Sequence, residues 1–146
     1  MSGKERFKVR VAPHLILLKD NHVLLHLRHN TGFADGMFSL VAGHIDGKES
    51  VIEAMIREAH EEAGIEIEPQ DLNLHCTMHR GFREGEEYLY LYFICRQWKG
   101  EVHNKEPHKC AELKFYPLND LPPNLLPPVR KGIECALNGI PYCEYG

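Results

Sequence analysis

The sequence has 146 residues, which is enough for one domain with a hydrophobic core of its own. Its formal net charge is −4, whereas a general nucleic-acid binder would show a basic surplus, so we expect no general binding of nucleic acid. No apolar run approaches the roughly 18 residues of a membrane span, and the N-terminus lacks the apolar core of a signal peptide, so we expect a cytoplasmic protein with no membrane partner. The five cysteines form no C-x-x-C pair, so we expect reduced thiols.

The first part of the chain is predicted to form a β-hairpin. Residues Lys8 to Leu18 are mostly apolar and β-prone, Lys19 to Asn21 favour a turn, and His22 to Arg28 alternate between apolar and polar side chains. Residues His29 to Gly36 are rich in turn formers and are expected to form a loop. A short strand is then expected from Met37 to Ala42.

The strongest helix signal in the chain runs from Ser50 to Ala63. Ser50 and Glu53 have the spacing of a capping box, in which each side chain accepts a hydrogen bond from the backbone of the other. Gly64 stands where a glycine commonly ends a helix.

The remaining elements are two long strands, a short strand and a second helix. The strands are expected at Leu74 to Phe82, Glu87 to Trp98 and Lys114 to Leu118, and the helix at Pro127 to Leu137, where prolines suit the first turn. The resulting order β-β-β-α-β-β-β-α predicts an α/β fold with helices packed on a mixed sheet. Without a linker or a repeat, we expect one domain over residues 1–146.

Three glutamates of the first helix share one side of it. At 100° per residue, Glu58, Glu61 and Glu62 lie within about 100° of one another, beside an apolar face, and Arg57 lies about 40° from Glu61. Like charges at this spacing cost roughly 0.2–0.5 kcal/mol per pair, and a hard divalent cation removes the repulsion by binding the carboxylate oxygens. A bare cluster of this kind is more typical of a solvated helix face, so the neighbouring residues decide between the two interpretations.

These neighbouring residues complete a longer pattern. The 23 residues from Gly43 to Ile65 contain every fixed position of the Nudix box, G-x5-E-x7-R-E-U-x-E-E-x-G-U, where U is a bulky aliphatic residue. Ala59 is the one departure, because it is small for a U position. So many fixed positions make the pattern far more specific than a lone glycine-rich loop. The chain therefore resembles the MutT-like Nudix hydrolases over essentially its whole length, which implies an α/β/α sandwich with a mixed sheet.

The resemblance also implies roles for individual residues. The implied metal ligands are the backbone carbonyl before the box and three glutamates: Ala42, Glu58, Glu61 and Glu62. Arg57 would orient one of these glutamates, Glu49 would support the site, and Gly43 would let the loop pass close to the metal. The implied cofactor is Mg²⁺, with Mn²⁺ as a substitute.

The general base is left between three candidates. Some family members use a glutamate in a loop before the last strand, which corresponds here to Glu106 as first choice and Glu112 as second. A box glutamate such as Glu61 is the third. Either loop glutamate could equally be a solvated carboxylate.

Residues outside the box are candidates for substrate contacts. Arg28, Arg80 and Arg83 could bind phosphate, and Phe33 or Phe38 could stack on a base. For each of them, the alternative is a surface charge or a core aromatic residue.

The implied reaction is hydrolysis of a phosphoanhydride in a nucleoside di- or triphosphate linked to a group X. The chain lacks the subtype signals of several relatives, among them a proline near Phe82, and this favours a MutT-like conversion of an NTP or dNTP to NMP and diphosphate. The alternative within hydrolases is a nucleotide-sugar or ADP-ribose pyrophosphatase. An isopentenyl diphosphate isomerase-like enzyme and a non-catalytic nucleotide-binding module belong to other classes, and the intact box argues against both. Homodimers are common in the family, but the sequence shows no interface signal.

Overall fold

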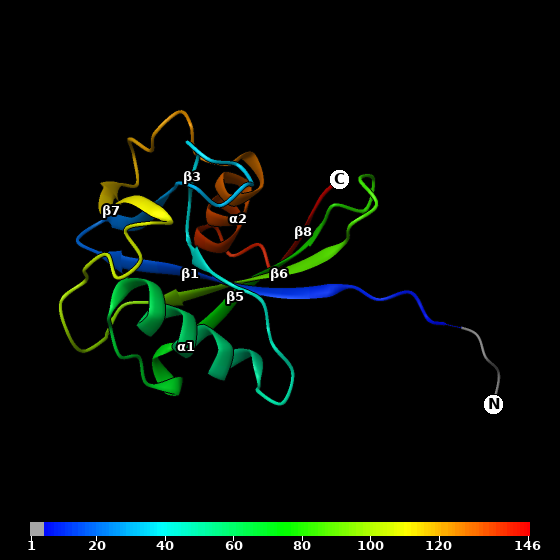
Figure 1. Cartoon of the computed structure of the whole chain (residues 1–146), viewed down its shortest axis with the longest axis horizontal. Coiled ribbons are helices and arrows are strands. Elements are labelled where there is room, and N and C mark those ends of the chain that lie inside the picture. The colour runs from blue at the N-terminus through cyan, green and yellow to red at the C-terminus, as the bar shows by residue number, and fades with distance from the viewer. Residues whose placement is uncertain (1–4) are drawn as a thin grey trace.

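The computed structural model describes residues 5–146 and contains eight strands, two α-helices and one 3-10 turn (Figure 1). In chain order they are β1 Arg10–Lys19, β2 His22–Arg28, β3 Phe38–Ser39, β4 Val41–Ala42, α1 Val51–Ala63, η1 Pro69–Asp71, β5 Asn73–Arg80, β6 Tyr88–Cys95, β7 Cys110–Pro117, α2 Pro127–Leu137 and β8 Tyr142–Tyr145.

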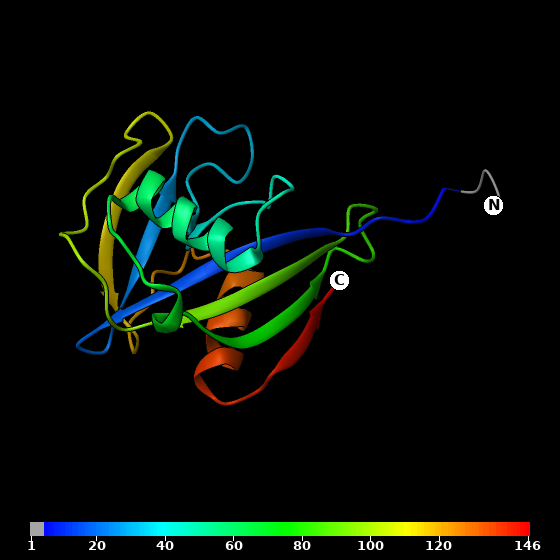
Figure 2. The same cartoon turned by 90° about the horizontal axis from the view of Figure 1, so that it is seen from below.

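The strands form a mixed sheet in the order β3-β2-β1-β6-β5-β8, with β4 also paired to β1 and β7 to β2. The central pair, β1 and β6, is parallel, while β1 and β2 form the expected antiparallel hairpin. Helix α1 covers one side of the strands and α2 the other (Figures 1 and 2). The mixed sheet with packed helices that the order of elements predicts, and the α/β/α sandwich that the resemblance implies, are thus confirmed. Within residues 5–146, no helix is both long enough and apolar enough to cross a membrane.

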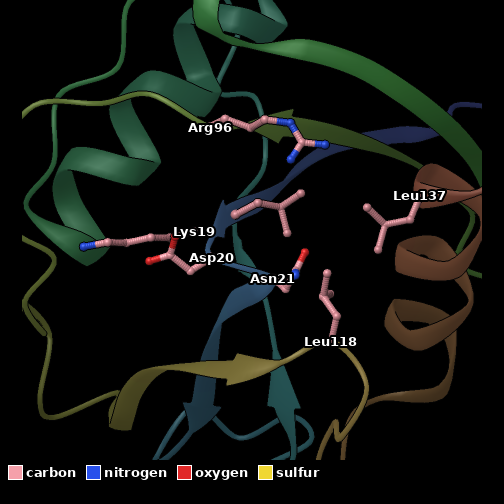
Figure 3. Close-up of a pocket in the computed structure, with 7 residues that line it drawn as sticks. Lys19, Asp20, Asn21, Arg96, Leu118 and Leu137 are labelled. Atoms are coloured by element: carbon pink, nitrogen blue, oxygen red, sulfur yellow. The ribbon is translucent and has the colours of Figure 1, made fainter.

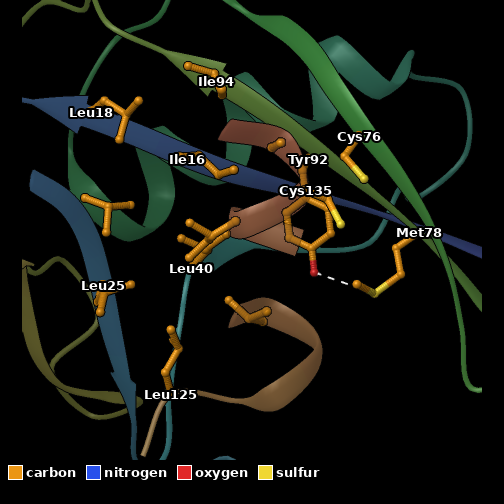
Figure 4. Close-up of a cluster of buried hydrophobic side chains, with 14 of the residues drawn as sticks. Ile16, Leu18, Leu25, Leu40, Cys76, Met78, Tyr92, Ile94, Leu125 and Cys135 are labelled. Carbon is orange, nitrogen blue, oxygen red and sulfur yellow. Dashed lines mark hydrogen bonds between the residues drawn. The ribbon is translucent and has the colours of Figure 1, made fainter. Parts of the chain in front are cut away.

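The core consists of two groups of buried side chains, one under each helix. Strand β1 contributes to both, because Leu15 and Leu17 pack on the α1 side while Ile16 and Leu18 pack on the α2 side (Figure 4). Such a strand reads as a continuous apolar run, because both of its faces are covered. Each of these side chains contributes roughly 1.5–3 kcal/mol through its burial.

Helix α1 begins and ends as its residues predict. The Ser50 hydroxyl accepts a hydrogen bond from the Glu53 backbone N–H at 3.0 Å, and the Glu53 carboxylate accepts one from the Ser50 N–H at 2.7 Å. Gly64 has φ +71°, a left-handed conformation that glycine adopts without strain, and its N–H donates to the His60 carbonyl.

Three strands differ most from the expectation. The strand expected over Met37 to Ala42 is divided at Leu40 into β3 and β4, which pair with β2 and β1 respectively. Strand β7 begins at Cys110 rather than Lys114, because β2 supplies partners along its whole length. Strand β8 was not expected, since four residues after Pro141 give little local signal and form a strand only by pairing with β5.

Candidate active site

Arg57 lies at the centre of a cluster of carboxylates. Its Nε and Nη2 donate to the two oxygens of Glu49 at 3.1 and 2.8 Å, and its Nη1 donates to Glu58 at 2.6 Å and to Glu61 at 3.2 Å. Its Nη2 also donates to the His44 carbonyl at 3.2 Å. The hydrogen bonds to Glu49, above all, raise the pKa of Arg57 and lower that of the Glu49 carboxyl. Arg57 therefore ties the loop before the helix to the glutamates on the helix.

Gly43 is needed because α1 approaches the loop closely. A Cβ at this position would overlap the carboxylate of Glu58. The backbone of Gly43 is held in turn by a hydrogen bond from its N–H to the Pro13 carbonyl of β1 at 3.3 Å. The glycine thus makes room for Glu58 to lie against the loop.

Glu62 is the most enclosed of the three box glutamates, with 11% of its side chain exposed. Burial raises the pKa of its carboxyl well above the usual value, and the neighbouring carboxylates of Glu58 and Glu106 raise it further, while a backbone hydrogen bond at Ala42 opposes the shift. The nearest histidine nitrogen, Nε2 of His26, lies 3.9 Å from Glu62 Oε1. Burial lowers the pKa of His26, so this ring is neutral near pH 7 and does not offset the negative charge.

This group of oxygens fits a hard divalent cation. The carboxylates of Glu58 and Glu106 lie close enough to Glu62 to disfavour its ionisation, and the backbone of Ala42 lies beside the same carboxyl group of Glu62. A cation such as Mg²⁺ takes carboxylate and carbonyl oxygens as ligands and removes this repulsion. Glu61 lies at the outer edge of the group, with 43% of its side chain exposed and its carboxylate bonded to Arg57.

The two loop glutamates occupy different places. The backbone N–H groups of His103 and Lys105 donate to the last carbonyls of α1, those of Ala63 and Glu62, which would otherwise lack partners. This contact brings Glu106 beside Glu62.

Glu112 lies on β7 and accepts a hydrogen bond from the hydroxyl of Tyr116, which packs against the α2-side core. Its neighbour in sequence, Leu113, packs on the α1 side. Successive side chains of a strand point to opposite faces, so Glu112 faces away from the box glutamates.

A cleft of about 450 Å³ opens beside the loop that precedes α1, with Ala42 and Gly43 in its wall. Arg28, Phe33 and Arg80, three of the expected substrate contacts, line it. Arg28 donates to the Phe33 carbonyl at 2.8 Å and lies 5.4 Å from the centre of its ring. Arg80 donates to Glu84 at 2.9 Å, and its buried Nε has no hydrogen-bond partner within the described part of the chain.

Aromatic side chains that the sequence did not single out form the floor of this cleft. The ring of His14 lies 4.3 Å from that of Tyr90, and Tyr90 lies 5.6 Å from Tyr88. Alternation along β6 could have placed Tyr88 and Tyr90 on one face, but His14 stands within an apolar run that gives no such signal.

Two of the expected substrate contacts lie outside the cleft. Phe38 is buried in the α2-side core, 7% exposed, and its ring meets that of Tyr116 edge-to-face at 5.2 Å. This corrects the expectation that Phe38 stacks on a base. Arg83 is exposed and lies over the ring of Phe82 at 5.1 Å.

A second hollow, of about 510 Å³, lies at the β1–β2 turn and the end of α2 (Figure 3). Its walls include Asp20, Asn21, Arg96 and Leu137, and none of the box residues borders it. It is therefore separate from the candidate active site.

The family model described as the NUDIX domain matches residues 8–136, which is most of the chain. The chain belongs to the Nudix family. Nudix proteins are hydrolases that act on pyrophosphate bonds, and they generally need divalent metal ions, in agreement with the carboxylate cluster around Glu62.

Among curated proteins, the chain is similar to the NAD-capped RNA hydrolase NudC of Escherichia coli, with 30% identity over 129 residues, covering 86% of this chain and 46% of that protein. NudC of Photorhabdus laumondii is 28% identical over 127 residues, covering 85% and 45%. The chain thus spans about half the length of the curated relatives it matches.

Solved structures share the fold. A MutT NUDIX hydrolase from Burkholderia pseudomallei matches with a TM-score of 0.80 and 28% identity, covering 88% of this chain and 98% of that one. A NUDIX hydrolase from Nitrosomonas europaea matches with a TM-score of 0.77 over 97% of this chain and 81% of that one. At 17% identity, the second match bears on the fold alone.

Proposed function

We propose that this Nudix chain is a Mg²⁺-dependent pyrophosphohydrolase that cleaves a phosphoanhydride in a nucleoside di- or triphosphate linked to a group X. The main support is the enclosed carboxylate of Glu62, which lies with Glu58 and Glu106 beside the backbone of Ala42. A cleft containing two arginines begins at the same loop. A cation site and a phosphate-binding cleft are thus adjacent, as such hydrolysis requires.

The ion would be held by the Ala42 carbonyl and by Glu58, Glu61 and Glu62. When bound, it would supply charge neutralisation at the phosphate oxygens and lower the pKa of a bound water. Arg57 keeps the carboxylates of Glu58 and Glu61 in place through its hydrogen bonds.

The remaining residues would bind and orient the substrate and move a proton. Arg28 and Arg80 would bind phosphate oxygens, and the Nε of Arg80, which has no hydrogen-bond partner among residues 5–146, is available for this contact. Phe33 and the rings of His14 and Tyr90 would border the nucleoside. Glu106, beside Glu62, would accept the proton of the attacking water.

For the substrate we propose an NTP or dNTP, converted to NMP and diphosphate as in MutT-like enzymes. The similarity to a MutT hydrolase over nearly the whole of both chains supports this choice. A second candidate is a dinucleotide diphosphate of the NAD type, which the 30% identity to NudC favours. ADP-ribose and nucleotide sugars contain the same kind of linkage and belong in the same test.

The test is an activity panel of NTPs, dNTPs, NAD, ADP-ribose and nucleotide sugars, each assayed with Mg²⁺ and with Mn²⁺. We expect hydrolysis that requires the metal and is fastest for one NTP or dNTP. Preference for NAD would replace the MutT-like assignment. Inactivity across the panel would favour a nucleotide-binding module.

The same activity panel, run on variants of the box glutamates, tests whether these residues form the metal site. We expect Glu61→Gln and Glu62→Gln each to lower turnover by about a hundredfold or more, the scale of losing one preorganised electrostatic contact. The matched control is Glu66→Gln, an exposed glutamate just beyond the helix, which should keep full activity. Full activity of both box variants would rule out the proposed metal site.

A further inference from the structure

Three cysteines from three separate elements converge on the α2 side of the sheet. Cys76 lies on β5, Cys135 on α2 and Cys143 on β8, and their sulfur atoms all lie within 4.8 Å of one another. The Sγ atoms of Cys76 and Cys143 are 3.6 Å apart, and all three are free thiols. We call these three residues the thiol triad.

The thiol triad differs from the other two cysteines in what its sulfurs contact. The thiols of Cys95 and Cys110 each donate to a nearby backbone carbonyl, at 3.2 and 3.1 Å. The hydrogen bond of Cys76, in contrast, is to the sulfur of Cys143. The sulfurs of the triad therefore face one another, which is the arrangement that several ligands of one ion require.

The surroundings of the thiol triad are apolar and include further soft groups. The three residues belong to the same core as Met78 and Tyr92, and the Tyr92 hydroxyl lies 3.9 Å from the Met78 sulfur (Figure 4). The exposed fractions of Cys76, Cys135 and Cys143 are 1%, 7% and 9%. Burial raises the pKa of the Cys76 thiol and raises that of Cys143 to about 12, so both are neutral near pH 7.

Neutral buried thiols are poor substrates for oxidation, because the thiolate is the reactive form. This argues against a disulfide switch between β5 and β8. A soft metal ion can still bind to neutral thiols, because it displaces the thiol proton as it binds and can be held by sulfur ligands alone.

We propose that the thiol triad is a binding site for a single Cu(I) ion. Soft thiolate and thioether ligands select Cu(I) and Zn²⁺ among common ions. A structural Zn²⁺ ion takes four ligands, and within residues 5–146 no fourth histidine, cysteine or carboxylate joins the three thiols.

On binding, each thiol that becomes a ligand loses its S–H proton to solvent and forms a Cu–thiolate bond, with no change of oxidation state. Two or three sulfur ligands complete the coordination of Cu(I), whereas three leave one position of a tetrahedral Zn²⁺ ion without a protein ligand. The charged amine of Lys131 slightly opposes the rise in the pKa of Cys76, and it donates to the Glu144 carbonyl at 2.6 Å.

The thiol triad is independent of the proposed catalytic site. It lies in the core under α2, whereas the box glutamates lie on α1, across the sheet. An ion at the triad would tie β8 and α2 to β5, and so would stabilise a four-residue strand at the edge of the sheet.

The test is anaerobic titration of the full chain with Cu(I) against a competing copper chelator. We expect one tightly bound equivalent, sulfur atoms as the only neighbours in X-ray absorption at the copper edge, and a rise in Tm of roughly 5–10 °C at a free ion concentration of a hundred times Kd. Zn²⁺ should bind much more weakly. A Zn²⁺ affinity equal to that of Cu(I) would overturn the assignment of the ion.

Single alanine variants locate the site. Cys76→Ala, Cys135→Ala and Cys143→Ala should each weaken Cu(I) binding by at least about tenfold, since even residues behind the ligands of a metal commonly contribute that much. Cys95→Ala is the matched control, a buried cysteine on the α1 side, and should bind as the parent does. If Cys76→Ala does not fold, Cys143→Ala still gives the answer, because Cys143 lies on β8, a four-residue strand at the edge of the sheet. Equal affinity in the parent and in Cys143→Ala, or equal weakening by Cys95→Ala, would overturn the proposal.

Discussion

Arg57 and Glu62 lie on the same helix, but the charge of Arg57 is balanced by its neighbours and that of an ionised Glu62 is not. Arg57 satisfies Glu49, Glu58 and Glu61 through hydrogen bonds at 2.6–3.2 Å. Glu62 is enclosed and lies beside a neutral His26 instead. Within residues 5–146 no lysine or arginine forms an ion pair with Glu62, so Glu62 is the carboxylate for which a cation would contribute most.

A second residue with a strongly shifted pKa is His14, in the floor of the cleft. Burial lowers its pKa to about 4, so the ring is neutral in the folded protein at pH 7. The unfolded chain binds this proton near pH 6.5, so stability is lost as the pH falls from about 6.5 to 4. The loss attributable to this residue is roughly 3 kcal/mol.

The free energy of unfolding in urea, measured at pH 4 and pH 7, checks this contribution of His14 to stability. His14→Gln, which cannot titrate, should lose less stability than the parent over this pH range. His75→Gln, a change at an exposed histidine, should behave as the parent does. Identical pH dependence in His14→Gln and the parent would contradict the assignment.

At the scale of elements, the segment between β6 and β7 carries Glu106 to the site. Its backbone caps the end of α1, and Asn104 braces it internally, since its Oδ1 accepts from the Glu106 N–H at 3.0 Å and its Nδ2 donates to the Cys110 carbonyl at 2.7 Å. The position of Glu106, the proposed proton acceptor, thus depends in part on the side chain of Asn104.

We expect Asn104→Ala to lower kcat by roughly 10- to 100-fold, the range typical of residues that orient a metal site from behind. KM should change little, because the arginines proposed to bind phosphate lie on other elements. Hydrogen exchange at the Glu106 amide should become faster. Asn119→Ala, in another exposed loop, serves as the control. An unchanged kcat in Asn104→Ala would show that the hydrogen bonds of Asn104 are not needed to position Glu106.

At the scale of the whole molecule, the packing of α2 on the sheet depends on Gly132. A Cβ at this position would overlap the ring of Tyr92, whose hydroxyl donates to the Pro128 carbonyl at 3.2 Å. Glycine inside a helix costs about 1 kcal/mol relative to alanine, so its presence here reflects the close approach of helix and sheet.

Gly132→Ala is therefore expected to destabilise the protein despite the better helix propensity of alanine. Overpacking costs typically about 1–3 kcal/mol, and the severe overlap with the Tyr92 ring places this change in the upper part of that range, above the gain of about 1 kcal/mol. Chemical denaturation measures the difference, with Glu134→Ala, an exposed position on the same helix, as the control. A more stable Gly132→Ala protein would mean that Tyr92 moves aside without cost.

The sequence by itself determined the local features of this protein. The capping box at Ser50, the left-handed Gly64 and the shared side of Glu58, Glu61 and Glu62 follow from helix geometry, which depends only on nearby residues. The Nudix box, a pattern of residue types, and the order of most elements could likewise be predicted, because both depend on residues close together in the sequence.

Only the tertiary structure decided which distant residues meet. It brought Glu106 rather than Glu112 beside Glu62, and it separated Phe33 in the cleft from Phe38 in the core. The thiol triad and the short β8 strand likewise exist only because three elements meet at one edge of the sheet. Burial and pairing are properties of contacts between segments far apart in the chain, and spacing along the sequence does not encode them.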